Sequence, residues 1–294
     1  MRIDRVLSLY FIHPLRKIIA RPNGIRIPIL MYHSICDERE FVHPYFRINT
    51  SSERFAEHMR FLKENDFNVI SLTDAVKILE TSSMTPVYPT DCGSGKYVVL
   101  TFDDGFADFR TGAFPILAEH GFSATVFLPT GFISEDRSIL NGKKCLRWSD
   151  VCELADSGVR FGSHTVTHPK LSGIPWDQVE MELRESKCML EERLGTEVES
   201  FSYPYAFPEE DYAFQARLQA SLRELGYANG VTTRVGTAAR GDDYYLLKRI
   251  PINSGDDAPF FRKKLDGGYD WIHGLQYGFK FLKGALNANG TGGQ

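Results

Sequence analysis

The chain has 294 residues, of which 43% are hydrophobic and 24% charged, values typical of a globular protein with a sizeable core. Its formal net charge is −4 at pH 7 and its pI is about 6.1, which excludes a globally basic surface and predicts no nucleic-acid partner. The five cysteines form no CxxC pair. We therefore expect reduced thiols in a cytoplasmic protein, without a disulfide framework or a thiolate zinc site.

Residues 1–24 are predicted to be an N-terminal extension. They contain a short apolar run, Val6–Ile12, which the basic segment His13–Lys17 ends. The run is short for the hydrophobic region of a signal peptide and too short to span a bilayer. We therefore expect no export; the alternative is a short amphipathic anchor that lies on a membrane surface.

From Ile25 onward, short β-rich runs alternate with segments of helical periodicity. The first predicted strand, 28–32, is followed by a helix that Thr50 opens, with Glu53 in a capping box and an apolar face of Phe55, Met59 and Leu62. Further strands are predicted at 67–72, 97–102, 123–128, 159–162, 200–203, 227–232 and 246–250, and further helices at 72–79, 109–120, 149–156, 176–194 and 208–225. This order predicts a parallel α/β sheet, either open or closed into a barrel.

One catalytic domain over residues 25–255 is the simplest interpretation. Within it, residues 81–96 are rich in Ser, Thr, Pro and Gly and are expected to form an exposed loop. Residues 256–294 form an aromatic-basic extension whose tail is expected to be disordered. The stretch from Trp271 to Lys283 is expected to cover the barrel, or alternatively to contact a membrane or a lipid-linked glycan.

Two carboxylates follow an apolar predicted strand, in the run Thr-Phe-Asp-Asp-Gly at 101–105. Asp103 and Asp104 are therefore placed at the carboxyl end of a buried strand, where α/β folds carry their active sites. Neighbouring residues of an extended chain point in different directions, so one carboxylate can bind a metal while the other handles a proton. The alternative, a solvated Asp-Asp-Gly turn, is weakened by the strand that leads into it.

His164 and His168 follow another predicted strand and are spaced i, i+4. On one helical turn both side chains would face the same way and bind one ion. With Asp104 they make an Asp-His-His set that leaves coordination positions for water and substrate, as a hydrolytic metal requires. For the spacing alone, surface or hydrogen-bonding histidines are the alternative.

These two motifs together resemble the first two signature motifs of the polysaccharide deacetylase family, carbohydrate esterase family four, over about residues 28–253. The resemblance implies a distorted (β/α) barrel with about seven parallel strands. It also implies that Asp103 is the general base and that Asp104, His164 and His168 bind a divalent metal. Zinc is the expected ion, and cobalt or nickel would suit the same ligands.

The run Ser-Tyr-Pro-Tyr at 202–205 resembles the third motif of the family, which is usually Arg-x-Pro-Tyr. The match implies that Pro204 contacts the substrate and that the Tyr205 backbone N–H helps to form the oxyanion hole. Ser202 stands where the family has an arginine that holds the catalytic Asp. We hypothesise that Arg249, on the last predicted strand, pairs with Asp103 instead; an ordinary surface arginine is the alternative.

The general acid is expected near the start of the chain, because the late Leu-x-His run that the family normally uses is absent. The run Ile-Leu-Met-Tyr-His at 29–33 resembles the circularly permuted subgroup of poly-N-acetylglucosamine deacetylases, in which this strand carries the acid. His33 would then protonate the leaving amine; a structural histidine is the alternative. By the same resemblance Trp148 and Leu171 would lie near the substrate groove, although both residue types are also common in a core.

These residues predict a metal-dependent hydrolase that removes N-acetyl groups from N-acetylglucosamine-type sugars of a polysaccharide or glycan intermediate, as in exopolysaccharide biosynthesis. The expected partner is the N-acetylated glycan itself. The alternatives are an O-acetyl esterase, a deacetylase or deformylase of a lipid-linked sugar, and an inactive carbohydrate-binding homologue. The serine at 202 favours the last of these, while the intact Asp-Asp and His-His pairs argue against it.

Overall fold

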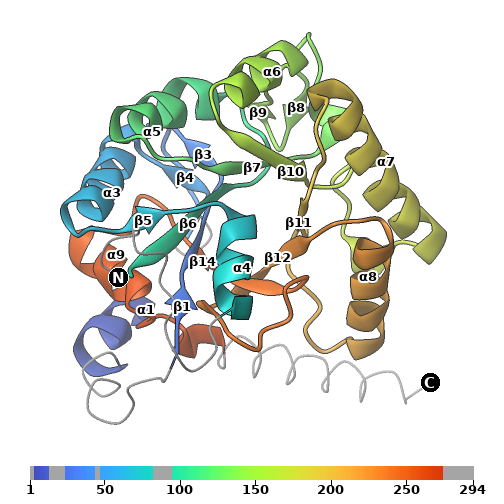
Figure 1. Ribbon diagram of the computed structural model, residues 1–294. Coiled ribbons are helices and arrows are strands. Elements are labelled where there is room, and N and C mark those ends of the chain that lie inside the picture. The colour runs from blue at the N-terminus through green and yellow to red at the C-terminus, as the bar shows by residue number, and fades with distance from the viewer. Residues whose placement is uncertain (1–2, 13–23, 44–46, 82–94, 274–294) are drawn as a thin grey trace, which may run out of the picture.

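The computed structural model describes residues 3–12, 24–43, 47–81 and 95–273. Within these ranges, seven parallel strands form a closed barrel (Figure 1). In their order around the ring, the strands are β2 (Ile29–Tyr32), β14 (Leu247–Pro251), β12 (Asn229–Val235), β11 (Ser200–Ser202), β10 (Arg160–Ser163), β7 (Thr125–Leu128) and β6 (Tyr97–Phe102). Pairing of β6 with β2 completes the ring. The predicted parallel sheet is confirmed, and the structure shows that it is closed. The ring is irregular between β12 and β14, where the register shifts.

Helices surround the strands (Figure 1): α3 (Ser52–Glu64), α4 (Leu72–Thr81), α5 (Phe114–His120), α6 (Trp148–Asp156), α7 (Trp176–Leu194) and α8 (Tyr212–Glu224). Each helix turns apolar residues inward, and in α3 these include the predicted Phe55, Met59 and Leu62. The bounds of α7 are those predicted, because Gly195 adopts the left-handed conformation (φ 67°) that ends the helix.

Short elements complete the described structure. They are β1 (Arg26–Ile27) paired with β13 (Ala238–Ala239), β3 (Ser34–Ile35) paired with β4 (Asn49–Thr50), β5 (Asn68–Val69) paired with β6 outside the ring, and the hairpin of β8 (Ile139–Leu140) and β9 (Lys143–Lys144). A π-helical turn (Phe109–Ala113) precedes α5, and single 3₁₀ turns occur at Thr130–Phe132 and Leu171–Gly173.

Two predicted helix starts were wrong. Thr50 does not open α3, because it is extended and pairs with Ile35 in the β3–β4 sheet. Ser51 is the N-cap instead, so Glu53 falls at N2 and not at the N3 position that a capping box requires. The helix expected from residue 208 begins at 212, because the side chain of Asp211 caps its first turn.

The two ends of the described chain pack side by side on the barrel. Helix α1 (Ile3–Leu7), the π-helical turn Ser8–Ile12 and α9 (Ala258–Leu265) lie together (Figure 1). The Trp271 indole N–H donates to the Ser8 hydroxyl at 2.9 Å, and Phe260 and Phe261 are fully buried. The sequence did not predict α9. As far as residue 273, the extension packs on the barrel. The alternatives for the Trp271–Lys283 stretch stay predictions, because residues 274–283 lie outside the described ranges.

Several expectations lie outside the described residues. They concern the basic segment 13–17, most of the loop at 81–96, most of the Trp271–Lys283 stretch, and the tail. No helix in the described ranges combines the length and the apolar character needed to cross a bilayer.

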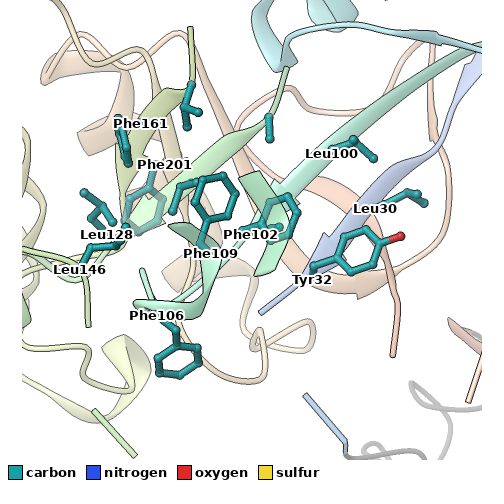
Figure 2. Close-up of a cluster of buried hydrophobic side chains, with 14 of the residues drawn as sticks. Leu30, Tyr32, Leu100, Phe102, Phe106, Phe109, Leu128, Leu146, Phe161 and Phe201 are labelled. Atoms are coloured by element: carbon teal, nitrogen blue, oxygen red, sulfur yellow. The ribbon is translucent and has the colours of Figure 1, made fainter. Parts of the chain in front are cut away.

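The hydrophobic core fixes the strand ends that carry the chemistry (Figure 2). Phe102, the last residue of β6, packs edge-on against Phe109 with ring centroids 4.9 Å apart and stacks on Tyr32 of β2 at 5.3 Å. All three side chains are buried, and each contributes about 1.5–3 kcal/mol of transfer free energy. The Asp103 N–H donates to the Tyr32 carbonyl at 3.0 Å. This packing therefore holds the residues that follow β2 and β6 next to each other.

His58 of α3 is a buried titratable group in contact with Tyr32 of this cluster. Its ring stacks on Phe261 with centroids 4.0 Å apart. Its Nε2 donates to the Asp256 carbonyl at 2.6 Å, and its Nδ1 accepts from the Tyr32 hydroxyl at 3.1 Å. Burial lowers the pKa of His58 from 6.5 to about 4, against a smaller opposing effect of the Asp256 carbonyl and charge. The folded protein therefore holds a neutral imidazole here.

We expect the free energy of unfolding to fall by about 3 kcal/mol between pH 7 and pH 4 on account of His58. The unfolded chain binds a proton at this residue near pH 6.5, whereas the folded chain does so only near pH 4. This stability is therefore complete above the unfolded pKa and is lost as the pH falls. Urea unfolding followed by circular dichroism at a series of pH values measures it.

His58→Gln is expected to flatten that pH dependence, because glutamine keeps a donor toward the Asp256 carbonyl but does not titrate. His120→Gln, which removes an imidazole from the end of α5, is the matched control. An unchanged slope in His58→Gln would contradict the assignment.

Candidate metal and catalytic site

The predicted site residues meet at one end of the barrel. Asp103 and Asp104 follow β6, His164 follows β10, His33 follows β2, and Arg249 is the central residue of β14. Because all the strands are parallel, their carboxyl ends share one face, which is where (β/α) barrels carry their active sites. The fold therefore brings together residues from four separate parts of the sequence.

Asp104, His164 and His168 form a buried set of possible metal ligands. One donor atom from each lies within 4.8 Å of the others. The His168 Nε2 is 3.2 Å from Asp104 Oδ1 and 3.2 Å from the His164 Nε2. The His164 Nδ1 lies 2.7 Å from the Ser202 carbonyl, so Nδ1 carries the proton and the Nε2 lone pair points toward the other ligands. Two imidazole nitrogens and a carboxylate directed at one point fit a divalent cation of the zinc, cobalt or nickel type.

The electrostatics around Asp104 suit a ligand. Burial by itself would raise the pKa of Asp104, but its contacts with His164 and His168 hold that pKa far below the usual range. The carboxylate is therefore ionised at neutral pH, which metal binding requires.

A tight loop, and not a helix, brings the two histidines together. The prediction that His164 and His168 share a helical turn was wrong: residues 164–168 contain no helix, and Thr165 (φ 69°) and His168 (φ 55°) are left-handed. Asp104 is also left-handed (φ 70°) and is followed by Gly105 at φ 60°, so it is not on extended chain as expected. Non-glycine residues in this region cost about 1–3 kcal/mol each. The surrounding contacts therefore hold the ligands against local preference.

Glu182 of α7 holds that loop, and sequence reasoning missed it. Its carboxylate accepts hydrogen bonds from the backbone N–H groups of Val166 and Thr167 at 2.7 and 2.9 Å and from the Thr167 hydroxyl at 2.5 Å. Glu182 is buried on the same helix face as Val179 and Leu183. An acidic residue on an apolar helix face is unusual, and this was the signal that could have identified it.

Arg249 is fully buried and hydrogen-bonds through all three guanidinium nitrogens. Its Nη1 and Nη2 donate to Asp103 Oδ1 and Oδ2 at 2.7 and 2.6 Å. The other bonds go to Thr101 Oγ1, Ser202 Oγ and the Thr232 carbonyl, at 3.2, 3.0 and 3.0 Å. The hypothesised contact with Asp103 is therefore present, and Arg249 is not a surface residue.

Ser202, which stands where the family has an arginine, forms hydrogen bonds to both Asp103 and Arg249. Its hydroxyl accepts from Arg249 and donates to Asp103 Oδ1 at 3.3 Å. Within the described chain, Asp103 Oδ1 thus has two donors and Oδ2 has one. Since each carboxylate oxygen has two lone pairs, Oδ2 keeps one that can take a proton.

The charge state of Asp103 follows from the same contacts. Burial alone would raise the pKa of Asp103, but the Arg249 guanidinium outweighs it, with smaller help from His164 and His33, and holds the pKa below its ordinary value. The carboxylate is therefore ionised at neutral pH and can act as a proton acceptor.

His33 and Tyr205 lie at the edge of the site. His33 is half-buried between β2 and β3, and its charge is among those that lower the pKa of both Asp103 and Asp104. The Tyr205 ring is half exposed, and its centroid is 4.7 Å from that of His168. Tyr205 is left-handed (φ 58°), and its backbone N–H has no hydrogen-bond partner within the described ranges. That N–H is therefore available to a ligand.

Pro204, Trp148 and Leu171 are all buried. Leu171 has no exposed surface, and Trp148 lies at the first turn of α6 with the Arg193 guanidinium 5.4 Å from its ring centroid. Both belong to the main hydrophobic core. Substrate contact by these three residues stays a prediction.

The chain is similar to known proteins in sequence and in fold. Residues 90–230 match the family model described as polysaccharide deacetylase. The chain is 30% identical over 230 residues to the Bacillus subtilis protein YxkH, provisionally named a polysaccharide deacetylase, and the match covers 78% of this chain and 72% of YxkH.

Solved structures show the same fold. The Streptococcus pyogenes deacetylase PplD in complex with acetate is 25% identical with a TM-score of 0.68, and the match covers 83% of this chain and 99% of that one. A de-N-acetylase from Aggregatibacter actinomycetemcomitans is 19% identical with a TM-score of 0.64, and the match covers 82% and 100%. The barrel, the clustered Asp-His-His set and the relationship to YxkH lead to one conclusion: the chain belongs to the polysaccharide deacetylase family.

Proposed function

We propose that the protein is a metal-dependent N-deacetylase that acts on N-acetylglucosamine-type units of a glycan. The observation that carries this proposal is a buried Asp104-His164-His168 set next to a carboxylate, Asp103, that Arg249 keeps ionised. An ion site and a separate proton acceptor are the two components that amide hydrolysis by an activated water requires.

A divalent ion bound by Asp104, His164 and His168 would polarise the acetyl carbonyl and make water more acidic. The remaining steps belong to this chain. Asp103 accepts the proton of the attacking water at Oδ2, because Oδ1 already has two donors. The Tyr205 N–H stabilises the negative charge that develops on the carbonyl oxygen. His33, on the neighbouring strand end, gives a proton to the departing amine, and acetate and an amino sugar result.

The relatives support the choice of reaction. The S. pyogenes relative is a deacetylase that binds acetate, the product expected here. The A. actinomycetemcomitans relative is a de-N-acetylase, which supports cleavage of an amide in preference to an ester. The expected substrate is therefore a glycan that carries N-acetyl groups.

Removal of the metal is expected to lower acetate release from N-acetylglucosamine oligomers by about 10²–10³-fold, since the lost stabilisation of the transition state amounts to several kcal/mol. Dialysis against a chelator followed by addition of zinc, cobalt or nickel measures the loss and its recovery. His164→Ala is expected to bind no stoichiometric metal and to show no recovery. His120→Ala is the matched control.

Two outcomes would contradict the proposal. Full activity of the metal-free protein would exclude metal dependence. Faster acetate release from O-acetylated than from N-acetylated glycans would identify an esterase on the same fold.

A further inference from the structure

Strand β12 contains a bulge beside the candidate site. Where β12 pairs with β14, three residues, 232–234, stand opposite the single residue Lys248. Extra residues of this kind bend a strand and turn its side chains in new directions, and they are common next to active sites. The bulge lies between β14, which carries Arg249, and β11, the strand that precedes Tyr205.

On one side, the bulge holds the arginine of the site. The Thr232 carbonyl accepts a hydrogen bond from the Arg249 Nε at 3.0 Å, and Arg249 in turn holds Asp103. The Thr232 hydroxyl donates to the Leu247 carbonyl at 3.1 Å and accepts from the Arg234 N–H at 3.2 Å. The backbone of the bulge is therefore fixed by hydrogen bonds of its own threonine.

On the other side, the Thr233 hydroxyl holds the loop that follows β11. It donates to the Tyr205 carbonyl at 3.0 Å and accepts from the Phe207 N–H at 2.9 Å. Phe207 is buried, and its ring packs edge-on against that of Tyr203 with centroids 4.9 Å apart. One hydroxyl thus fixes the chain immediately after the N–H that is the proposed oxyanion donor.

The bulge also keeps the Tyr205 N–H out of the strand pairing. The Tyr203 N–H donates to the Val231 carbonyl at 3.0 Å, as part of the ladder between β11 and β12. Such bonds recur at every second residue of a parallel pair, so a continued ladder would join the Tyr205 N–H to the Thr233 carbonyl. The shifted register and the left-handed backbone of Tyr205 (φ 58°) interrupt that ladder. A left-handed residue costs about 1–3 kcal/mol, which the two bonds of the Thr233 hydroxyl help to offset.

The third residue of the bulge holds the same loop further along. Glu209 is only 6% exposed, and its carboxylate lies 3.3 Å from the Nε of Arg234. The Nε2 of His273, in the C-terminal extension, also contacts this carboxylate. The loop 203–211 is therefore attached to the bulge at two points, Thr233 and Arg234.

We propose that the bulge of β12 positions the oxyanion donor, and that Thr233 is the positioning residue for the Tyr205 N–H. This inference rests on the proposed function, in which that N–H stabilises the charge on the carbonyl oxygen. Thr233 acts through Tyr205 and takes no part in bond cleavage. Because Thr232 holds Arg249 from the same bulge, one short segment aligns both the base, Asp103, and the oxyanion donor.

Thr233→Val is the test, because valine has nearly the shape of threonine but no hydroxyl. It is expected to lower kcat for acetate release from N-acetylglucosamine oligomers by about 30-fold, less than the loss of about 10²–10³-fold when an oxyanion donor is removed outright. The KM and the bound metal should stay close to those of the wild type, because the interaction strengthens only in the transition state. Thr233→Ser, which keeps the hydroxyl, is expected to retain the wild-type kcat.

Two further measurements separate positioning from a general loss of stability. An aryl acetate also reacts through an oxyanion, so its cleavage by Thr233→Val should fall by the same factor as amide cleavage. Inhibition by a methylphosphonamidate of glucosamine, whose tetrahedral phosphorus group carries the oxyanion charge, should weaken by that factor too. Thr237→Val is the matched control. It removes a buried hydroxyl that donates to Asp270 Oδ2 at 3.0 Å outside the candidate site, so thermal stability should fall while kcat and inhibition stay unchanged.

The outcomes keep this inference apart from the proposed function. A wild-type protein that cleaves the aryl acetate but no N-acetylated sugar would overturn the proposed function, and the aryl acetate would still test Thr233. Inactivity on both substrates would overturn both. Wild-type kcat in Thr233→Val, or an equal loss in Thr233→Val and Thr233→Ser, would overturn the role of Thr233 alone. If Thr233→Val does not fold, Thr233→Ala removes the same hydroxyl and the same results decide.

Discussion

Asp103→Asn is expected to lower kcat for acetate release by about 10³-fold, within the range of about 10²–10⁴-fold that general-base assistance contributes. Asparagine keeps the shape of aspartate and can still accept a hydrogen bond from Arg249, but it cannot take a proton from water. The KM and the content of bound metal should stay close to those of the wild type, because Asp104 is untouched. Initial rates on N-acetylglucosamine oligomers, with metal analysis of the same sample, measure both.

Asp150→Asn is the matched control for this variant. Asp150 is also fully buried and pairs with arginines, lying 3.0 Å from Arg137 and 3.3 Å from Arg147. It lies on α6 and outside the candidate site. Its replacement is expected to lower thermal stability without a change in kcat. Undiminished turnover by Asp103→Asn would remove Asp103 from the role of base.

His33→Ala separates the acid from the base in the same assay. An amine leaves poorly unless it is protonated, so amide cleavage is expected to slow by about 10²-fold. An aryl acetate releases a phenolate that needs no proton, and its cleavage should be nearly unaffected. Asp103→Asn should slow both reactions, because both require an activated water. An equal loss on both substrates in His33→Ala would contradict the assignment as proton donor.

Arg249→Met is expected to reduce the free energy of unfolding by about 3–5 kcal/mol, the usual cost of leaving a buried charge without its partner. Methionine fills much of the space of the arginine stem, so the loss comes from Asp103 and not from a cavity. The kcat should fall as well, because the carboxylate loses the two bonds that orient it. Denaturant unfolding at neutral pH measures the stability, and initial rates measure kcat.

Moving the arginine from β14 to β11 provides a sharper version of this experiment. The Ser202 hydroxyl is 3.3 Å from Asp103 Oδ1, so a guanidinium carried by residue 202 reaches the same carboxylate from the other side. The double variant Ser202→Arg, Arg249→Met is therefore expected to recover part of both the stability and the kcat. Ser202→Arg alone should destabilise the protein, because two guanidinium groups would then compete for one place. Failure of the double variant to improve on Arg249→Met would contradict the role of Arg249 as the positioning residue for Asp103.

Local sequence patterns correctly predicted several of the strands and helices. The strand 97–102 and the helix 176–194 have the predicted bounds, because an unbroken apolar run and a helix closed by glycine depend only on nearby residues. The placement of Asp103, Asp104 and His164 at strand ends followed from the same patterns. Parallel strands then bring those ends to one face of the barrel.

Local patterns failed where distant contacts outweigh local preference. The spacing of His164 and His168 suggested a helical turn, but Glu182 of α7 fixes a left-handed loop there. Thr50 looked like a helix cap, but pairing with Ile35 makes it extended. In both cases a residue more than ten positions away in the sequence supplies the hydrogen bonds. The periodicity of hydrophobic residues in a local segment cannot predict such a distant partner.

The amino-acid sequence was sufficient to establish the alternation of strands and helices and the types of residue in the site. The tertiary structure decided that the sheet closes, that the Asp-His-His set converges on one point, and that Arg249 pairs with Asp103 across a separation of 146 residues. That pairing exists because ring closure buries Asp103 and Arg249 side by side. Once both are removed from water, an unpaired charge on either one would be too costly to keep.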